Sequence, residues 1–414
     1  MSRKPSLHIP HPPARPGEVA DFSYLTLSDP GEVEKPEVSC TVRDIAHLPD
    51  QLIRVLDDQG HAVGPWHPEL DTHDLQIGLR NMLLTRLFDA HMVRMQRQGK
   101  ISFYIQSLGE EAIPVAQAMA LRPSDMLFPS YRTQGLQVAR GRSLVDLMSQ
   151  CLSNTNDMCK GRQMPVMYHW ARGNIFSVTG NLTVQYPQAV GWAMAAAIKG
   201  EDDIASVWIG DGSTAEADFH HALTFAAVYQ APVILNVVNN QWAISTFQGF
   251  AGGERRTLAT RGAGYGIAAL RVDGNDFLAV HAATQWAADR ARRGHGPCLI
   301  EHITYRAGAH STSDDPSRYR PKDEYKSWPL GDPIERLQQH LTTTGGWNDA
   351  RNTELTAELT EHVSDCWHEA EAYGTMTSEP FLDRSELFED VYRDVPAHLV
   401  KQRDELRDLL ERDQ

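Results

Sequence analysis

The chain has 414 residues, 41% of them hydrophobic, and its formal net charge at pH 7 is −15. That length can bury the core of one large α/β domain with extensions, and the negative charge argues against a nucleic-acid-binding surface. The sequence contains no run of about eighteen apolar residues, so no membrane-spanning helix is expected.

The N-terminal residues and the cysteines favour a cytoplasmic protein. The first residues show neither the apolar stretch of a secretory signal nor the Arg-rich amphipathic pattern of a transit peptide. The five cysteines form no CxxC pair, and their odd number argues against a disulfide framework. We therefore expect reduced, mostly buried thiols in a soluble cytoplasmic protein.

Residues 1–70 are rich in Pro, Gly and charged residues and show little periodicity. We expect an extended arm with a short hairpin at residues 52–63, whose turn would contain Gly60. Such an arm cannot build its own core, so it is expected either to wrap around a partner or to be disordered. Residues 73–98 then predict a long amphipathic helix.

Two loops that precede helices carry polar groups. Gly109 leads into a helix whose first turn would contain Glu110 and Glu111, and complementing the helix dipole is the favoured interpretation of these carboxylates. Tyr131 and Arg132 stand in the second loop, where Arg can bind a phosphate through two hydrogen bonds and Tyr through one. From the residues alone, an ordinary exposed pair of loop residues is the commoner alternative.

The most informative part of the chain is a strand, a helix and a strand in its middle. Residues 204–209 predict a buried strand, residues 214–229 a helix, and residues 232–238 a second strand. This order predicts a crossover unit of a parallel sheet. Asp211 and Asn240 then lie just past the carboxyl ends of neighbouring strands, where open α/β sheets bind ligands.

The residues at these two strand ends are suited to a magnesium-bound phosphate. Asp211 offers a carboxylate and Asn240 an amide oxygen, and Mg²⁺ prefers such ligands together with phosphate oxygens. Gly210 and Gly212 permit a tight turn and close approach to a ligand, and a helix starting near residue 214 would direct its positive end at a phosphate. A lone Gly-Asp-Gly is more often an ordinary turn, but here twenty-six residues separate it from Asn-Asn, which is far more specific.

The second half of the chain continues the alternation of strands and helices. Residues 268–272 predict a strand, Asp276 caps a helix that ends near residue 293, and residues 298–305 predict another strand. The glycines around residue 264 do not fit the GxGxxG spacing, which disfavours a Rossmann dinucleotide site. The alternation predicts an α/β fold with a parallel sheet covered by helices on both faces.

Three parts of the chain are expected. They are an extended N-terminal arm (residues 1–70), an α/β domain (residues 71–330) and a helical C-terminal segment (residues 331–414). The last helix of this segment carries dense charge, which is typical of a surface or interface helix, so the segment would pack on the domain and on partner subunits.

Six strings stand out along the chain: ISFY…GEEA (101–112), SYR (130–132), KGRQMPV (160–166), GDG…NN (210–240), RVDGND (271–276) and HSTSDD (310–315). Together they resemble the α subunit of the thiamine-diphosphate-dependent first component of branched-chain 2-oxo acid dehydrogenases. The resemblance runs from about residue 75 to the C-terminus and implies the thiamine-diphosphate-binding fold. ISFY and HSTSDD are more similar to the branched-chain enzymes than to the pyruvate enzymes.

The resemblance implies a thiamine diphosphate site in which Asp211, Asn240 and the main-chain carbonyl of Trp242 bind Mg²⁺. His310 and Tyr131 would act in catalysis, and an imidazole with a pKa near about 6.5 could move a proton at neutral pH. The residues that would line the cofactor are Tyr131, Arg132, Gly180, Leu182, Asp211, Gly212, Ser213, Asn240 and His310.

Two positions depart from the pattern of the family. Relatives often have Arg where this chain has Val238, so one contact to the diphosphate would be missing. A potassium loop of some relatives corresponds to Thr179, Asn181, Val184 and Gln185. Because Val184 has no side-chain oxygen, potassium binding is doubtful here.

The resemblance also implies partners and a reaction. In this family a separate β subunit supplies the glutamate that activates the cofactor, so an α₂β₂ heterotetramer with active sites between the subunits is expected. The assembly would decarboxylate branched-chain 2-oxo acids such as 3-methyl-2-oxobutanoate and transfer the acyl group to lipoyl groups of a core acyltransferase.

Other functions remain open at this point. The chain could be the α subunit of a pyruvate or acetoin dehydrogenase, which substrate profiling would reveal. It could also be a non-catalytic module that binds Mg²⁺ and phosphate. A nicotinamide-dependent enzyme is disfavoured by the missing fingerprint.

Overall fold

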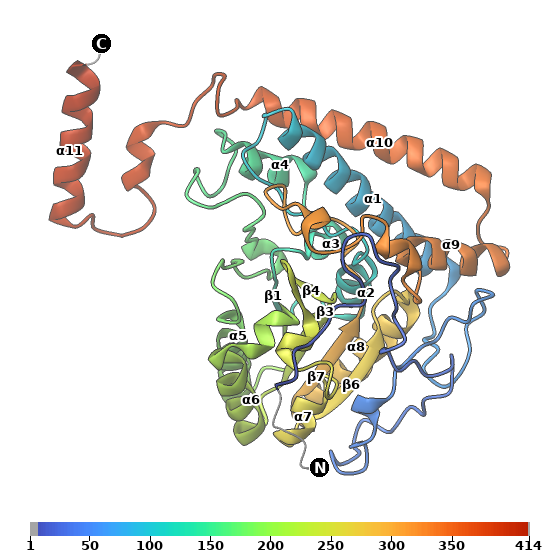
Figure 1. Cartoon of the computed structure of the whole chain (residues 1–414). Helices are drawn as coiled ribbons and strands as arrows, with labels where there is room; N and C mark the ends of the chain where they lie inside the picture. Colours follow the sequence, from blue (N-terminus) through green and yellow to red (C-terminus); the bar gives the residue numbers. More distant parts are fainter. Residues whose placement is uncertain (1–6, 413–414) are drawn as a thin grey trace.

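A five-stranded parallel sheet lies at the centre of the protein (Figure 1), and its strand order is β1-β2-β3-β7-β6. The structure is a computed structural model and describes residues 7–412. The strands are β1 (Met126–Phe128), β2 (Ala205–Gly210), β3 (Val233–Asn239), β6 (Ala268–Asp273) and β7 (Cys298–Ile303). Every residue of β3 and β7 is buried, as expected for central strands covered on both faces.

Helices cover both faces of this sheet. The alternation of side chains along β3 sends Ile234 and Val238 into one core and Val233, Leu235 and Val237 into the other. The first core is completed by α1 (Thr72–Arg97), α2 (Ala112–Ala120) and α8 (Phe277–Arg292), and the second by α5 (Gln185–Lys199), α6 (Ala217–Tyr229) and the short α7 (Thr260–Gly264). The predicted α/β fold class is confirmed.

The crossover from β2 through α6 to β3 is present as predicted, but α6 starts later than expected. Asp211 is followed by a 3-10 turn, Gly212–Ala215, in which the Thr214 hydroxyl donates to the Asp211 carbonyl at 2.7 Å. Helix α6 begins only at Ala217. Because that turn takes up the residues after β2, the positive end of α6 lies one turn further from Asp211 than the sequence indicated.

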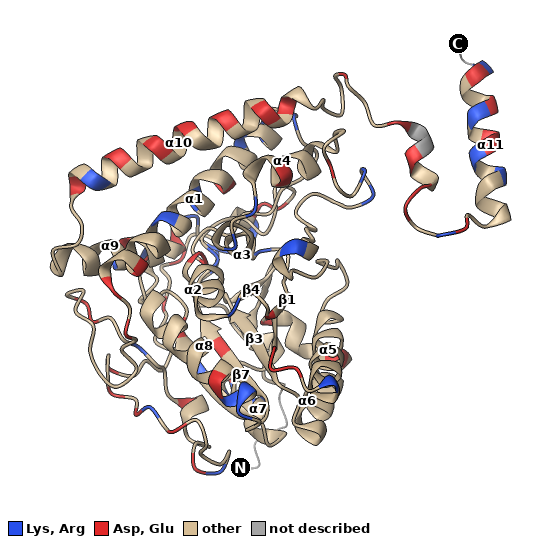
Figure 2. Ribbon diagram, turned by 180° about the vertical axis from the view of Figure 1, so that it is seen from behind, with Lys and Arg blue, Asp and Glu red and all other residues tan. Residues whose placement is uncertain are grey.

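A helical layer lies beyond the carboxyl ends of the strands. It contains α3 (Gln134–Ala139), α4 (Leu144–Leu152), α9 (Pro333–Thr343) and α10 (Asp349–Ala372). α10 runs along α1 and α4 (Figure 1), and Trp367 and Cys366 pack into the core that these helices share. Acidic residues are spread along α10, whereas α11 (Ala397–Arg412) carries both charges (Figure 2).

The C-terminal tail leaves the body of the protein. α11 has no buried residue, and Figure 1 shows it standing apart at the end of an irregular segment.

Two small strands, β4 (Trp242–Ala243) and β5 (Thr246–Phe247), form a hairpin directly after β3. Within residues 7–412, no helix combines the length and the apolar character needed to cross a membrane.

The N-terminal arm packs on its own domain, so the expectation of a disordered arm is wrong for the described residues, while wrapping around a partner stays a prediction. The Phe22 ring lies edge-on to Tyr305 and Trp328, with centroids 5.9 and 5.2 Å away. Ile53 bridges to Val272 of β6 in parallel. The expected hairpin is reduced to one antiparallel bridge between Leu56 and Ala62. The arm cannot form a core of its own, and these aromatic and strand-like contacts with the domain stabilise it instead.

A buried ion pair ties the start of β1 to the end of α8. Asp125 is fully buried, and its carboxylate accepts hydrogen bonds from Arg292 and from the Ile204 N–H at 3.1 Å. Asp125→Ala should lower the free energy of unfolding by about 3 kcal/mol, because it removes the carboxylate that neutralises Arg292, whose side chain is only 10% exposed. Urea unfolding measures this change. Asp202→Ala, which removes a mostly exposed partner of Arg122, is the control and should change the stability little. Equal effects of the two substitutions would contradict the assignment.

Candidate active site

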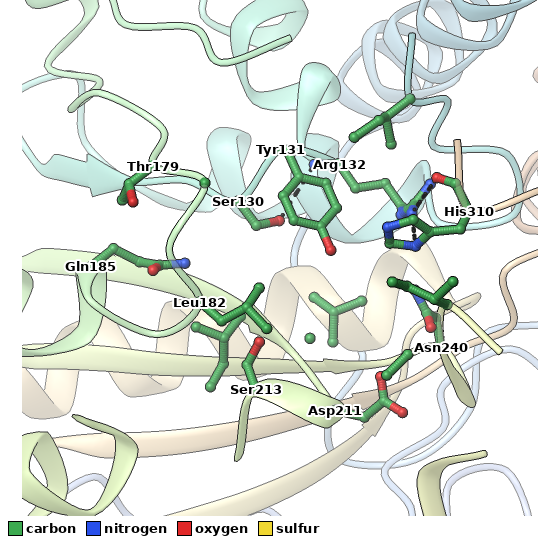
Figure 3. A pocket seen from close by; sticks show the side chains of 18 of the residues that line it. Ser130, Tyr131, Arg132, Thr179, Leu182, Gln185, Asp211, Ser213, Asn240 and His310 are labelled. Carbon is green, nitrogen blue, oxygen red and sulfur yellow. Dashed lines mark hydrogen bonds between the residues drawn. The ribbon is translucent and has the colours of Figure 1, made fainter. Parts of the chain in front are cut away.

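The parallel register of β2 and β3 places Asp211 and Asn240 side by side. Gly210 pairs with Val238 at the carboxyl ends of the two strands, and each polar residue follows within two positions. Both side chains face a cavity of about 310 Å³ that opens at this edge (Figure 3). The predicted placement of these two side chains at the carboxyl ends of neighbouring strands is confirmed.

All the residues predicted to line the cofactor or bind the metal line this one cavity. They come from five separate stretches: the loop before α3, the loop before α5, the end of β2, the end of β3 and the loop after β7. The predicted lining residues are Tyr131, Arg132, Gly180, Leu182, Asp211, Gly212, Ser213, Asn240, Trp242 and His310. The structure brings these residues together, while their roles in binding and catalysis stay predictions.

The Asp211 carboxylate fits a metal ion. Asp211 is 2% exposed, and its Oδ2 atom has no hydrogen-bond partner among the described residues. Burial raises the pKa of this carboxyl group to about 7. A buried, unpartnered carboxylate oxygen is costly unless a cation meets it. The same residues 7–412 hold no cluster of three His, Cys, Asp or Glu side chains suited to a metal, so amide and main-chain oxygens would have to complete the coordination.

The other two expected metal ligands already make protein contacts. Asn240 Oδ1 accepts a hydrogen bond from the Trp242 N–H at 3.2 Å, and the Trp242 carbonyl accepts one from Arg306 at 2.8 Å. An amide or carbonyl oxygen has two lone pairs, so both atoms keep capacity for a cation. Asp211 and Asn240 therefore fit Mg²⁺ directly, whereas the Trp242 carbonyl would share its oxygen with a guanidinium.

Gly212 is required by close packing. A Cβ at this position would lie 2.5 Å from the Cβ of Ala243, whereas a Cβ at Gly210 would meet nothing within 4 Å. Neither glycine adopts a positive φ. A glycine is therefore required at Gly212, where a side chain would collide with Ala243. Neither the available space nor the backbone conformation requires one at Gly210.

Arg132 provides the cationic side of the cavity. It is only 5% exposed, so the alternative of an exposed loop residue is wrong for this position. Its Nη1 donates to the Gln106 carbonyl, and its Nη2 donates to the His310 carbonyl at 2.9 Å. Tyr131 lies beside it with its ring edge-on to His310 at 5.9 Å, and burial raises the pKa of the Tyr131 phenol, which keeps it a hydrogen-bond donor.

His310 does not have the pKa assumed from its residue type. Burial, followed by the charges of Arg132 and Arg306, lowers the pKa of the imidazole to about 3. Its Nδ1 lies 3.3 Å from Arg132 Nη2, so this nitrogen accepts a hydrogen bond and the network assigns the proton to Nε2. The imidazole is therefore neutral at pH 7 in this state of the protein, in contrast to the value near 6.5 expected from the sequence.

Two buried charged residues of the site were not predicted as such. Glu110 lines the cavity and accepts a hydrogen bond from Asn240 Nδ2 at 2.8 Å, and Arg306 holds the carbonyls of Trp242 and Ile244, both at 2.8 Å. The helix-dipole interpretation of the glutamates is wrong, because α2 begins after them and Glu111 pairs with Arg86 at 2.7 Å. The GEEA string was the available signal, but nothing in it indicated contact with Asn240.

Of the two positions that depart from the family pattern, Val238 lines the cavity and Val184 does not. Val238 is buried there, so Arg132 is the one arginine among the described lining residues. In the loop of the doubtful potassium site, Gln185 donates to the Trp208 carbonyl, and its Oε1 has no partner among the described residues. Val184, at the start of α5, still offers no side-chain oxygen.

Comparisons with known proteins match nearly the whole chain. The family model described as dehydrogenase E1 component matches residues 79–379, and the model described as the N-terminal part of the 2-oxoisovalerate dehydrogenase E1 alpha subunit matches residues 3–42. The second match extends the similarity into the arm, which the six strings did not reach.

Several relatives are similar over almost their full length. A 2-oxoisovalerate dehydrogenase subunit alpha of Pseudomonas aeruginosa is 57% identical over 400 residues, covering 97% of this chain and 98% of that protein. The mitochondrial 2-oxoisovalerate dehydrogenase subunit alpha of Mus musculus is 38% identical over 398 residues, with 95% and 85% covered. That of Homo sapiens is 37% identical over 398 residues, with 95% and 84% covered.

The raised pKa of Asp211 predicts how pH affects the stability of the protein without metal. Between the ordinary aspartate pKa of 3.8 and about 7 the folded state holds a proton that the unfolded state has lost, so the free energy of unfolding falls as pH rises through this window. Asp211→Asn has no ionisable group at this position, so it should not undergo this fall in stability. In thermal melts without metal or cofactor, the variant should melt above the wild type at pH 8, and the difference should shrink towards pH 5. A constant difference at all pH values would contradict the buried, unpartnered carboxylate.

Proposed function

Because the chain belongs to the dehydrogenase E1 component family, we propose that it is the α subunit of a branched-chain 2-oxo acid dehydrogenase. With a β subunit it would decarboxylate 3-methyl-2-oxobutanoate and related acids, and it would transfer the acyl group to lipoyl groups of a core acyltransferase. The observation that carries the proposal is the cavity at the sheet edge, where an unpartnered Asp211 oxygen lies across from a buried Arg132.

Thiamine diphosphate and Mg²⁺ are the proposed cofactors. Asp211 and Asn240 would hold the metal, with the Trp242 carbonyl as a further ligand. Tyr131, Arg132 and the backbone at Gly212 and Ser213 would bind the diphosphate; Gly180 and Leu182 would line the remainder of the cofactor. When bound, this cofactor supplies the electron sink for decarboxylation of a 2-oxo acid.

His310 is proposed to hold and move a proton at Nε2. The Arg132 contact occupies Nδ1, so Nε2 is the atom free to donate towards the cavity. Burial is the largest cause of the low imidazole pKa, and the charges of Arg132 and Arg306 lower it further. A bound diphosphate would offset the charges of the two guanidinium groups and so raise this pKa. Tyr131, edge-on to the ring, restricts the orientation of the imidazole.

The lining of the cavity supports an apolar, branched substrate. Six apolar side chains with large or branched groups are among the residues that line the cavity, and an apolar lining favours an apolar ligand. The side chains are Phe103, Ile105, Met164, Met167, Leu182 and Ile244. The printed names of the relatives agree with this substrate class, so a pyruvate or acetoin dehydrogenase is not favoured.

An α₂β₂ assembly is part of the proposal. Large apolar side chains are exposed on the outer sides of α5 and α6, namely Ile198, Phe225, Val228 and Tyr229, and such exposed groups mark interaction surfaces. The α11 helix buries nothing within the chain. Free cysteines, four of them buried, support the proposed cytoplasmic location.

The chain alone should be inactive. Among the described residues, the acidic, basic and imidazole side chains lining its cavity are Glu110, Arg132, Asp211 and His310, and the family's activating glutamate would come from the β subunit. Co-purified α and β chains with thiamine diphosphate and Mg²⁺ should decarboxylate 3-methyl-2-oxobutanoate faster than pyruvate. Release of CO₂ from each acid measures this. Full turnover by the isolated α chain, or a preference for pyruvate, would contradict the proposal.

His310 substitutions separate proton transfer from binding. His310→Ala should lower the overall activity of the complex by about 10²- to 10⁴-fold and weaken cofactor binding. His310→Asn keeps a polar group for the diphosphate but cannot transfer a proton, so acyl transfer to a lipoyl substrate should still fail. Near-normal acyl transfer by His310→Asn would make the histidine a binding residue only.

A further inference from the structure

Glu110 is a buried carboxylate next to a site proposed for an anion. It is 4% exposed, stands just before the cap residue of α2, and lines the cavity with Asp211, Asn240 and Arg132. A carboxylate in this place repels a diphosphate and has lost most of its hydration. A carboxylate is therefore unfavourable here unless its contacts with neighbouring residues compensate for the cost.

The first contact fixes the rotation of an amide. An asparagine presents either its oxygen or its NH₂ group, depending on how the amide is turned, whereas a carboxylate can only accept hydrogen bonds. Glu110 Oε1 accepts from Asn240 Nδ2 at 2.8 Å, so the Asn240 oxygen must face the opposite side. There it accepts from the Trp242 N–H at 3.2 Å, which agrees with the same rotation.

The second contact orients a guanidinium. Arg132 Nε lies 3.5 Å from the same Glu110 oxygen, and both side chains are 5% exposed. The Nη1 and Nη2 atoms of Arg132 donate to the carbonyls of Gln106 and His310. With all three nitrogens engaged, the plane of the guanidinium is fixed beside the cavity.

We propose that Glu110 is a positioning residue that turns the Asn240 oxygen towards a divalent cation and holds Arg132 in the orientation that receives a diphosphate. The proposal rests on the function proposed above. Groups that orient metal ligands from behind commonly affect metal affinity about 10- to 100-fold. A simple Coulomb effect differs between the two ligands, because removing the negative charge would strengthen diphosphate binding and weaken cation binding. The test therefore needs one variant that keeps the charge and one that keeps the length.

Two substitutions separate geometry from charge. Glu110→Asp keeps the charge but shortens the side chain, so it cannot keep the 2.8 Å contact with Asn240. Glu110→Gln keeps the length and an acceptor oxygen but loses the charge. In the co-purified complex with thiamine diphosphate, Mn²⁺ affinity followed by electron paramagnetic resonance should fall about 10- to 100-fold in Glu110→Asp, while Glu110→Gln should retain most of it.

Glu111→Gln is the matched control. Glu111 is the adjacent buried glutamate, but it binds Arg86 and the Gly109 N–H and does not line the cavity. This variant should lower the melting temperature and leave Mn²⁺ affinity unchanged. Wild-type affinity in Glu110→Asp, an equal loss in Glu110→Gln, or a similar loss in Glu111→Gln would each overturn the inference. A wild-type complex that binds neither Mn²⁺ nor thiamine diphosphate would overturn the proposed function itself.

Discussion

The Asp211 carboxylate is buried with one oxygen that no described residue satisfies, and the surrounding structure keeps it in that state. The parallel pairing of β2 with β3 fixes its position, and the 3-10 turn after it prevents the chain from moving away. Packing of Gly212 against Ala243 leaves no room for that turn to relax. A fold that keeps a costly group in place at its sheet edge is organised around the ligand that would satisfy it.

A network of hydrogen bonds and one ion pair surrounds this carboxylate. Glu110 lies between Asn240 and Arg132, Arg132 holds His310, and Arg306 holds the main chain after Asn240. Gln241 and Ile244 adopt positive φ in that stretch of main chain, so the Arg306 contacts and the bond from the Tyr24 hydroxyl to Gln241 keep a strained turn in shape. The cavity is thus prepared before any ligand enters, which reduces the cost of ordering it on binding.

Much of this site could be predicted because it depends on local patterns. Runs of consecutive residues indicate the buried strands and give the spacing from Asp211 to Asn240. The register of the strands then determines that the two side chains meet. Contacts between distant segments could not be predicted. Nothing local to Glu110 indicates that Asn240 lies 2.8 Å away. The low pKa of His310 depends on its burial and then on two arginines, one of them from a distant segment. For the same reason the arm was misjudged, since the surface that receives Phe22 is formed by residues around Tyr305.

The central claim is that Asp211 and Asn240 hold a divalent cation that carries the diphosphate. The most direct measurement is the anomalous scattering of Mn²⁺ in a crystal of the α/β complex grown with thiamine diphosphate. The account predicts one strong peak at about 2.1 Å from oxygens of both side chains, with diphosphate oxygens completing its coordination and the Arg132 guanidinium on the opposite side of the diphosphate. A diphosphate bound in the cavity with the Mn²⁺ peak elsewhere, or with no Mn²⁺ at Asp211, would contradict it.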